Sequence, residues 1–161
     1  MNMIDVMRSG HQTVVKTVDG LEPERWQAPP VVGVWSTKHV IAHLSSFEAM
    51  LIDVLTSIAD DDAPTPVLDA LRAGPAQFNT DQVAMRDHLS PDEALREYQT
   101  NFAEALALAR ALPDHVRRRN GLLEWYGSEY DLEDFIAYTF YGHKREHAAQ
   151  IVLFRKSLER G

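Results

Sequence analysis

The stretch YTFYGHKREHAAQIVLF, residues 138–154, decides how the chain folds. Its apolar side chains recur at helical spacing, without the alternation that is typical of a strand. His143 and His147 stand four residues apart, so an α-helix places one above the other with about 5–6 Å between their Cβ atoms. Phe140 and Ile151 share this face. We therefore expect both imidazoles to point into a helical core.

Helix signals of the same kind recur along the chain. Ser90, Pro91 and Glu93 form a full start signal, with a cap, a proline at the first helical position and a capping box. Four long segments are predicted, at about residues 2–18, 36–58, 90–112 and 131–160. Residues 68–88 are more weakly helical and predict one or two short helices. The predicted fold is all-α: a four-helix bundle with a long crossing connection between the second and third main helices, as one domain of residues 1–161.

The composition excludes several functional classes. The formal net charge is −8, which disfavours partners that present phosphate, so we expect no nucleic acid and no anionic membrane surface. There is no cysteine, which excludes disulfides, thiolate nucleophiles and cysteine-bound zinc. No apolar run reaches the roughly 18 residues of a membrane span, and no signal peptide is evident. We therefore expect a cytoplasmic protein.

A third histidine joins the pair on the last helix. His43 lies on the apolar stripe of the second predicted helix, between Val40 and Phe47. One buried histidine is usually an ordinary core residue. Three unpaired imidazoles, however, would each lower the stability of the folded protein by about 1–3 kcal/mol. One divalent ion that accepts a lone pair from each ring satisfies all three. We therefore predict a metal site at His43, His143 and His147, provided that the two helices face each other.

The residues around these histidines resemble a known family. WSTKHVIAHLSSFE (residues 35–48) and YGHKREHAAQI (residues 141–151) are similar to the DinB-like superfamily of metal-binding four-helix bundles. The stretch FNTDQVAMRDHLSPDEALREYQTNFAEAL (residues 78–106) resembles its ClbS/DfsB branch. The resemblance implies that His43, His143 and His147 bind a divalent metal, zinc or nickel, and it favours a homodimer. It also implies a reaction among those of the superfamily, which includes hydrolase-like members and S-transferases that use a low-molecular-weight thiol.

Other residues allow more than one interpretation. HKREH also fits the H-x-x-E-H peptidase pattern, with Glu146 as base, but a surface charge beside Lys144 and Arg145 explains Glu146 better. Three arginines at 117–119 are either a solvated loop or an anion clamp over the metal. His11 is expected to be a hydrogen-bonded core histidine or to line a pocket. The remaining histidines are expected to be solvated: His39, His88 and His115.

Three functions are compatible with these observations. The first is a metal-dependent enzyme that acts on a small-molecule substrate, as a hydrolase or a thiol-dependent S-transferase, in detoxification or resistance. The thiol would have to be a cosubstrate, because the chain has no cysteine. The second is a non-catalytic protein that sequesters a small molecule, with a structural metal or none. The third is a helical dimer without a ligand. The sequence assigns no catalytic or substrate-binding residue.

Overall fold

The computed structural model describes residues 2–161, and this part of the chain is helical without a strand. The predicted all-α class is therefore confirmed for these residues. The elements, in chain order, are α1 (Met3–Val18), α2 (Pro23–Trp26), α3 (Thr37–Ala59), α4 (Pro66–Ala73), α5 (Pro75–Met85), α6 (Pro91–Ala111), α7 (Asp114–Arg117), α8 (Leu132–Ile136), the π-helix η1 (Ala137–Tyr141) and α9 (Gly142–Arg160).

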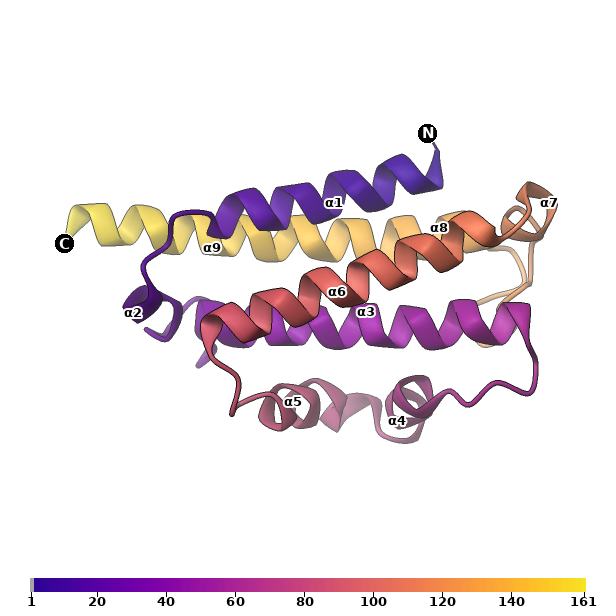
Figure 1. The fold of residues 1–161 in the computed structure, drawn as a ribbon, viewed down its shortest axis with the longest axis horizontal. Helices are drawn as coiled ribbons and strands as arrows, with labels where there is room; N and C mark the ends of the chain where they lie inside the picture. Colours follow the sequence, from indigo (N-terminus) through magenta and orange to yellow (C-terminus); the bar gives the residue numbers. More distant parts are fainter. Residues whose placement is uncertain (1) are drawn as a thin grey trace.

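The long helices α1, α3, α6 and α9 lie alongside one another (Figure 1). α3 packs mainly against α6, and α9 packs mainly against α1. The two short helices α4 and α5 occupy the connection from α3 to α6, where the sequence predicted one or two short helices, and both contact α3. As a result, the two long helices of the second half, α6 and α9, pack against the two long helices of the first half, α3 and α1.

The helix starts follow the predicted capping signals. Ser90 Oγ accepts the backbone N–H of Glu93 at 3.2 Å, and the Glu93 carboxylate accepts the N–H of Ser90 at 2.8 Å. α3 starts with a similar reciprocal pair, in which Ser36 Oγ accepts the N–H of His39 and His39 Nδ1 accepts the N–H of Ser36. His39 is therefore a half-buried capping residue, and the prediction that it is solvated was wrong. In each cap, the side chain of one residue accepts the backbone N–H of the other, so two N–H groups at the helix start are paired.

The last predicted helix is divided into three elements. Asp131 caps its start, at the predicted first residue of the segment 131–160, because its carboxylate accepts the N–H of Asp134 at 2.8 Å. The chain then passes from α8 through the π-helix η1 into α9. A π turn holds an extra residue, which changes the facing of the following helix by roughly 100° relative to a continuous α-helix. This widened turn ends at Tyr141, two residues before His143.

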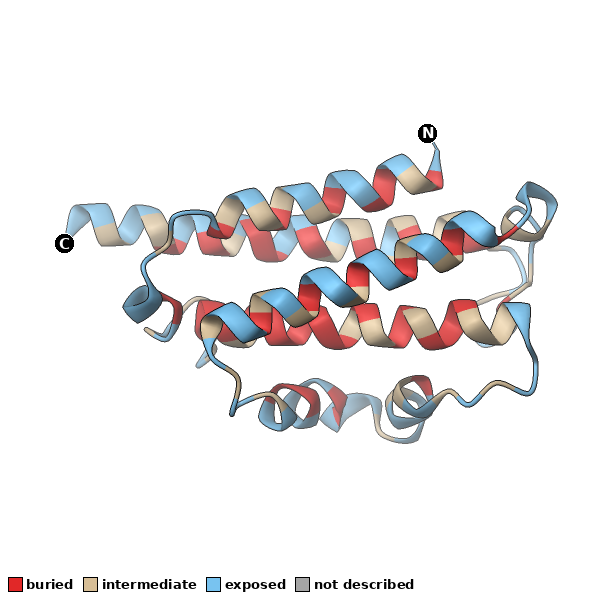
Figure 2. Ribbon diagram, in the orientation of Figure 1, coloured by how far each residue is buried: buried red, intermediate tan, exposed pale blue. Residues whose placement is uncertain are grey.

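The core lies between the long helices (Figure 2). Buried side chains occupy the facing sides of these helices, and α3 contributes more of them than any other element described. By length and composition, α3 alone among the described helices could cross a membrane. However, 67% of its apolar window is buried against the rest of the structure, which is typical of a core helix.

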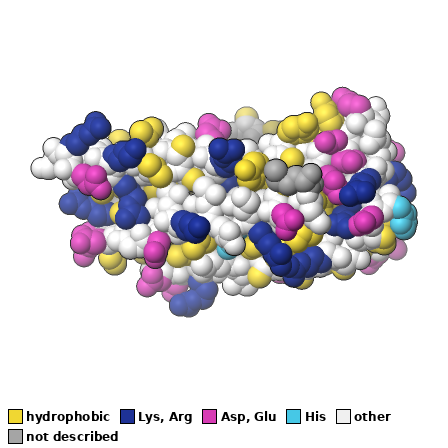
Figure 3. Space-filling view, turned by 90° about the horizontal axis from the view of Figure 1, so that it is seen from above, with side chains coloured by type: hydrophobic (Ala, Val, Ile, Leu, Met, Phe, Trp, Pro, Cys, Tyr) yellow, Lys and Arg dark blue, Asp and Glu magenta, His cyan; other side chains and the backbone are white. Residues whose placement is uncertain are grey.

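The surface carries charges of both signs. Figure 3 shows lysine and arginine side chains interspersed with aspartate and glutamate on the face seen from above. Such mixing gives no continuous cationic stripe on this face, and a phosphate backbone binds to surfaces that have one.

Candidate metal centre

Three histidines that are distant in the sequence meet between α3 and α9. His43 lies in the second turn of α3, while His143 and His147 lie in the first two turns of α9. The Nε2 atom of His143 is 2.9 Å from that of His43 and 2.9 Å from that of His147. All three ligand atoms lie within 4.8 Å of one another. The structure thus brings together the three histidines that the sequence predicted to be close.

The cluster is largely shielded from water. His43 and His147 are 3% and 8% exposed, and His143 is half-buried. The rings of Trp35 and Phe47 each lie 5.0 Å from the ring of His43, centroid to centroid, and Phe47 lies 4.7 Å from His143. Trp35 ends the loop before α3, and Phe47 is one turn beyond His43. These aromatic rings form an apolar wall around the nitrogen cluster.

Gln150 fixes the orientation of one ring. Its side-chain Oε1 lies 2.7 Å from His147 Nδ1. An amide oxygen only accepts hydrogen bonds, so Nδ1 carries the proton and the Nε2 atom of neutral His147 carries the lone pair. His43 Nδ1, in contrast, is buried without a hydrogen-bond partner among residues 2–161. Outer hydrogen bonds of the Gln150 kind are usual for histidines that bind metals.

The donor set fits a divalent ion. His143 Nε2 faces two other Nε2 atoms, and one N–H cannot point at both along good hydrogen-bond directions. An ion that accepts one lone pair from each imidazole satisfies all three. In a tetrahedral zinc site with bonds of about 2.0–2.1 Å, neighbouring nitrogens are about 3.3 Å apart. The two separations of 2.9 Å therefore need to open by a few tenths of an ångström. The third, between His43 and His147, is at most 4.8 Å and would have to close by up to about 1.5 Å.

Burial keeps the rings in the form that binds metal. Desolvation, followed by the charges of His143 and His147, lowers the pKa of His43 to about 3. Desolvation, followed by the charges of His147 and Lys144, lowers the pKa of His143 to about 4. Both rings are therefore neutral at pH 7, and neutral imidazole is the ligand form.

A family comparison agrees with this geometry. The sequence model of the DinB superfamily matches residues 7–151. The chain belongs to the DinB superfamily. This superfamily is metal-binding, and the three histidines of this member could hold the ion. A crystal structure of a protein from Streptococcus pneumoniae, a structural-genomics target, is similar in fold: the TM-score is 0.81 at 10% identity, over 96% of this chain and 88% of that one. No curated protein matches the chain significantly.

An ion pair beside the DinB-superfamily histidines was missed by the sequence analysis. Lys144, which the sequence analysis named only as a neighbour of the surface charge Glu146, is buried and pairs with Glu48 of α3, which is fully buried. Both residues occupy helix positions that continue the apolar faces, since Lys144 is four residues after Phe140 and Glu48 is four residues after Leu44. This spacing of four residues from a buried apolar side chain was the sequence signal that could have predicted the burial of both residues.

Other candidates lie away from the cluster or are exposed. Glu146 is exposed, as the surface interpretation predicted, and does not serve the histidines as a base. Arg119 lines a cavity together with Ser57 near the C-terminal end of α3, whereas His43 lies near the other end. This placement does not support the anion clamp. The predicted solvated histidines His88 and His115 are exposed.

His11 differs in part from its prediction. It lines a cavity of about 320 Å³ between α1 and α6, as one alternative held. However, its Nδ1 is buried without a hydrogen-bond partner in residues 2–161, so it is not the hydrogen-bonded core residue of the other alternative. Its ring stacks on Phe102 with 3.8 Å between centroids and 3° between planes. Stacking, rather than hydrogen bonding, holds this ring in place.

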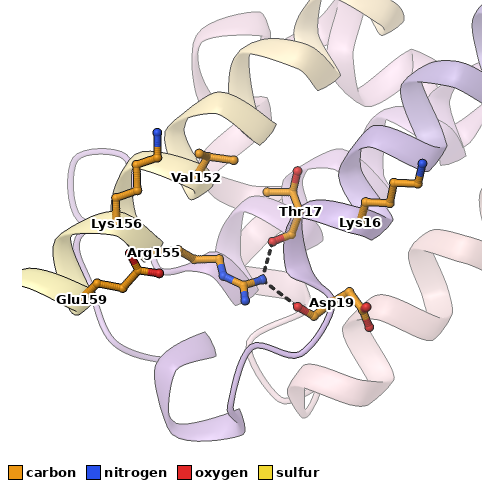
Figure 4. A pocket seen from close by; sticks show the side chains of 7 residues that line it. All are labelled: Lys16, Thr17, Asp19, Val152, Arg155, Lys156 and Glu159. Atoms are coloured by element: carbon orange, nitrogen blue, oxygen red, sulfur yellow. Dashed lines mark hydrogen bonds between the residues drawn. The ribbon is translucent and has the colours of Figure 1, made fainter.

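A further cavity of about 450 Å³ lies between the C-terminal ends of α1 and α9 (Figure 4). Arg155 spans it and donates from Nη1 to the carbonyl oxygens of Thr17 at 2.8 Å and Asp19 at 2.7 Å. The arginine is thus engaged in capping the end of α1. Lys156 and Glu159 place opposite charges on the same rim, which suits a contact between helix ends rather than a ligand site.

Proposed function

We propose that this DinB-superfamily chain is a divalent-metal-dependent enzyme that acts on a small molecule, by hydrolysis or by transfer of a low-molecular-weight thiol. The observation that carries the proposal is the convergence of three Nε2 atoms within 4.8 Å, in a cluster with an aromatic wall. Three histidines leave a coordination position for water or substrate, an arrangement typical of catalytic rather than structural zinc.

Each residue around the cluster has a distinct part in this proposal. His43, His143 and His147 would hold the ion through Nε2, and Gln150 keeps the proton of His147 on Nδ1. Trp35 excludes water from one side. A bound divalent ion would supply Lewis acidity, which polarises a substrate oxygen or lowers the pKa of water toward 7.

The finer predictions from the sequence belong to this proposal. They are zinc or nickel as the ion, a ClbS/DfsB-like branch, and the DinB-like four-helix arrangement with its long connection between α3 and α6. A thiol, if used, comes as a cosubstrate because the chain lacks cysteine. The cytoplasmic location, the homodimer, and the absence of nucleic-acid and membrane partners also stay predictions.

Metal analysis tests the centre. Untagged protein, purified without a nickel column, should contain close to one equivalent of a transition metal, or take it up with an increase in melting temperature. His43→Ala should lose the ion, while His88→Ala, which changes an exposed histidine, should retain it. Less than about one-tenth equivalent in the wild type, with no thermal shift on adding zinc or nickel, would remove the basis of the proposal.

Turnover separates the enzyme from a sequestering protein. Metal-loaded protein should consume an ester or amide with water, or a thiol with an electrophile, and His143→Ala should abolish that metal-stimulated reaction. Stoichiometric binding of the small molecule that survives His143→Ala, without turnover, would favour sequestration instead.

A further inference from the structure

The buried ion pair Glu48–Lys144 lies beside the histidine cluster and joins the same two helices. Glu48 is five residues after His43 on α3, and Lys144 directly follows His143 on α9. The side chains of Glu48 and Lys144 are 0% and 5% exposed. Apart from the Lys144 ammonium, neither carboxylate oxygen of Glu48 has a partner within the described residues.

α3 and α9 have few other links between them. Figure 1 shows that they run in opposite directions, and each packs mainly on a different neighbour, α3 on α6 and α9 on α1. Few of their residues approach closely at the backbone. Long side chains, those of the three histidines and of this ion pair, span much of the space between them. Ile151 of α9 also belongs to the same buried apolar cluster as Ile41 and Leu44 of α3. These contacts therefore contribute to the rotation and axial register of α9 against α3, which the packing of α9 on α1 also constrains.

The Lys144 side chain is confined by two further helices. Its ammonium lies 4.9 Å from the ring centroid of Phe102 and 5.6 Å from that of Tyr98, both on α6. On the α1 side, a Cβ at Gly10 would lie 3.3 Å from Lys144 Cδ, so glycine permits the close approach. The adjacent cavity of about 10 Å³ has room for about one water. The pair is thus a rigid contact and not a second ligand site.

Stability alone is a poor explanation for such a pair. Well-packed apolar residues in place of a buried ion pair are often neutral or stabilising, whereas a buried pair can select one register over others. We propose that Glu48 and Lys144 are positioning residues of the metal centre, because their ion pair sets α9 against α3 so that the three Nε2 atoms converge. This inference rests on the proposed function of the histidine cluster.

The test compares two double variants that each remove one ion pair. Glu48→Leu with Lys144→Met removes the buried pair. Arg86→Met with Glu97→Leu is the matched control, because that pair, at 2.8 Å, links the end of α5 to α6 and leaves α3 and α9 alone. The first variant should keep its melting temperature in a chelator but bind zinc about 10–100-fold more weakly, as is typical when outer contacts of a metal site are lost. Its cobalt complex should show a changed visible spectrum.

Two additional measurements keep the outcomes distinct. Glu48→Asp retains the charge but shortens the reach, so it should weaken zinc binding severalfold even if the double variant fails to fold. In the metal-free wild type, ring protons of His43 and His143 should show mutual nuclear Overhauser effects that the double variant loses. Unchanged zinc affinity and cobalt spectrum in Glu48→Asp or the double variant would overturn the positioning role. A wild type without metal affinity would instead refute the metal centre, and the ring contacts would still decide whether the pair positions the histidines.

Discussion

Removing Lys144 alone should expose how strongly the buried carboxylate depends on its partner. In Lys144→Met, Glu48 stays 0% exposed and loses the only cation that it contacts in the described chain. Breaking a buried pair in this way typically destabilises a protein by about 3–5 kcal/mol. The variant can avoid a buried unpaired charge by keeping the carboxyl protonated. A free glutamate has a pKa near 4.3, so protonation at pH 7 costs about 3.7 kcal/mol. The destabilisation should therefore not exceed this value.

This limit makes the effect dependent on pH. The cost of protonation falls by about 1.4 kcal/mol per pH unit, so the destabilisation should shrink to about 1 kcal/mol near pH 5. Urea unfolding of the metal-free protein in chelator, followed by circular dichroism at both pH values, measures it. At pH 7 the melting temperature should fall by about 6–15 °C, given a loss of about 3–3.7 kcal/mol and 2–4 °C per kcal/mol at this chain length.

Two comparisons decide whether the reasoning holds. Adding Glu48→Leu to Lys144→Met should restore most of the stability, because no buried charge is then left unpaired. Glu97→Gln, which breaks a more exposed pair while Arg86 keeps its hydrogen bonds to Gln82, should cost no more than about 1 kcal/mol. A loss below about 1 kcal/mol for Lys144→Met at pH 7, or an equal loss at pH 5, would show that Glu48 finds another partner or reaches water.

Three further outcomes are expected. Gln150→Leu should weaken zinc binding at least tenfold by freeing the His147 ring, measured by chelator competition, and unchanged affinity would contradict the hydrogen bond's role. Arg155→Met should cost about 0.5–1.5 kcal/mol in urea unfolding because two partly exposed backbone carbonyls lose their donor, and no measurable change would argue against the cap. Folding lowers the pKa of His11 to about 4 and of His43 to about 3, so the unfolded chain binds more protons below about pH 6.5. The metal-free protein should therefore be most stable above pH 6.5 and weaken as the pH falls toward 4, and a flat profile in urea unfolding would refute this.

Patterns among residues close in the sequence predicted more of this structure than could be predicted about contacts between distant residues. The starts at Ser36, Ser90 and Asp131 were predictable because a cap involves residues only a few positions apart. The meeting of His43 with the pair on α9 was also predictable, since histidines on apolar faces must share the core.

Two features escaped the sequence analysis for physical reasons. The π-helix η1 has no characteristic residue type, and its stretch reads as ordinary helix. The Glu48–Lys144 pair was missed because a lone charge on a helix is normally solvated, and only its partner 96 positions away makes burial tolerable. Contacts between residues so far apart depend on how the helices are placed, which short-range patterns do not determine.

The widened turn η1 has a consequence for how such a centre can arise or disappear. It contains one residue more than an α-helical turn, and it lies between the anchored helix α8 and the two histidines of α9. Deleting a single residue there would turn both imidazoles by roughly 100° away from α3 while every ligand stayed in the sequence. A change in length at this point would therefore separate the histidines of α9 from His43 without exchanging any of the three residues.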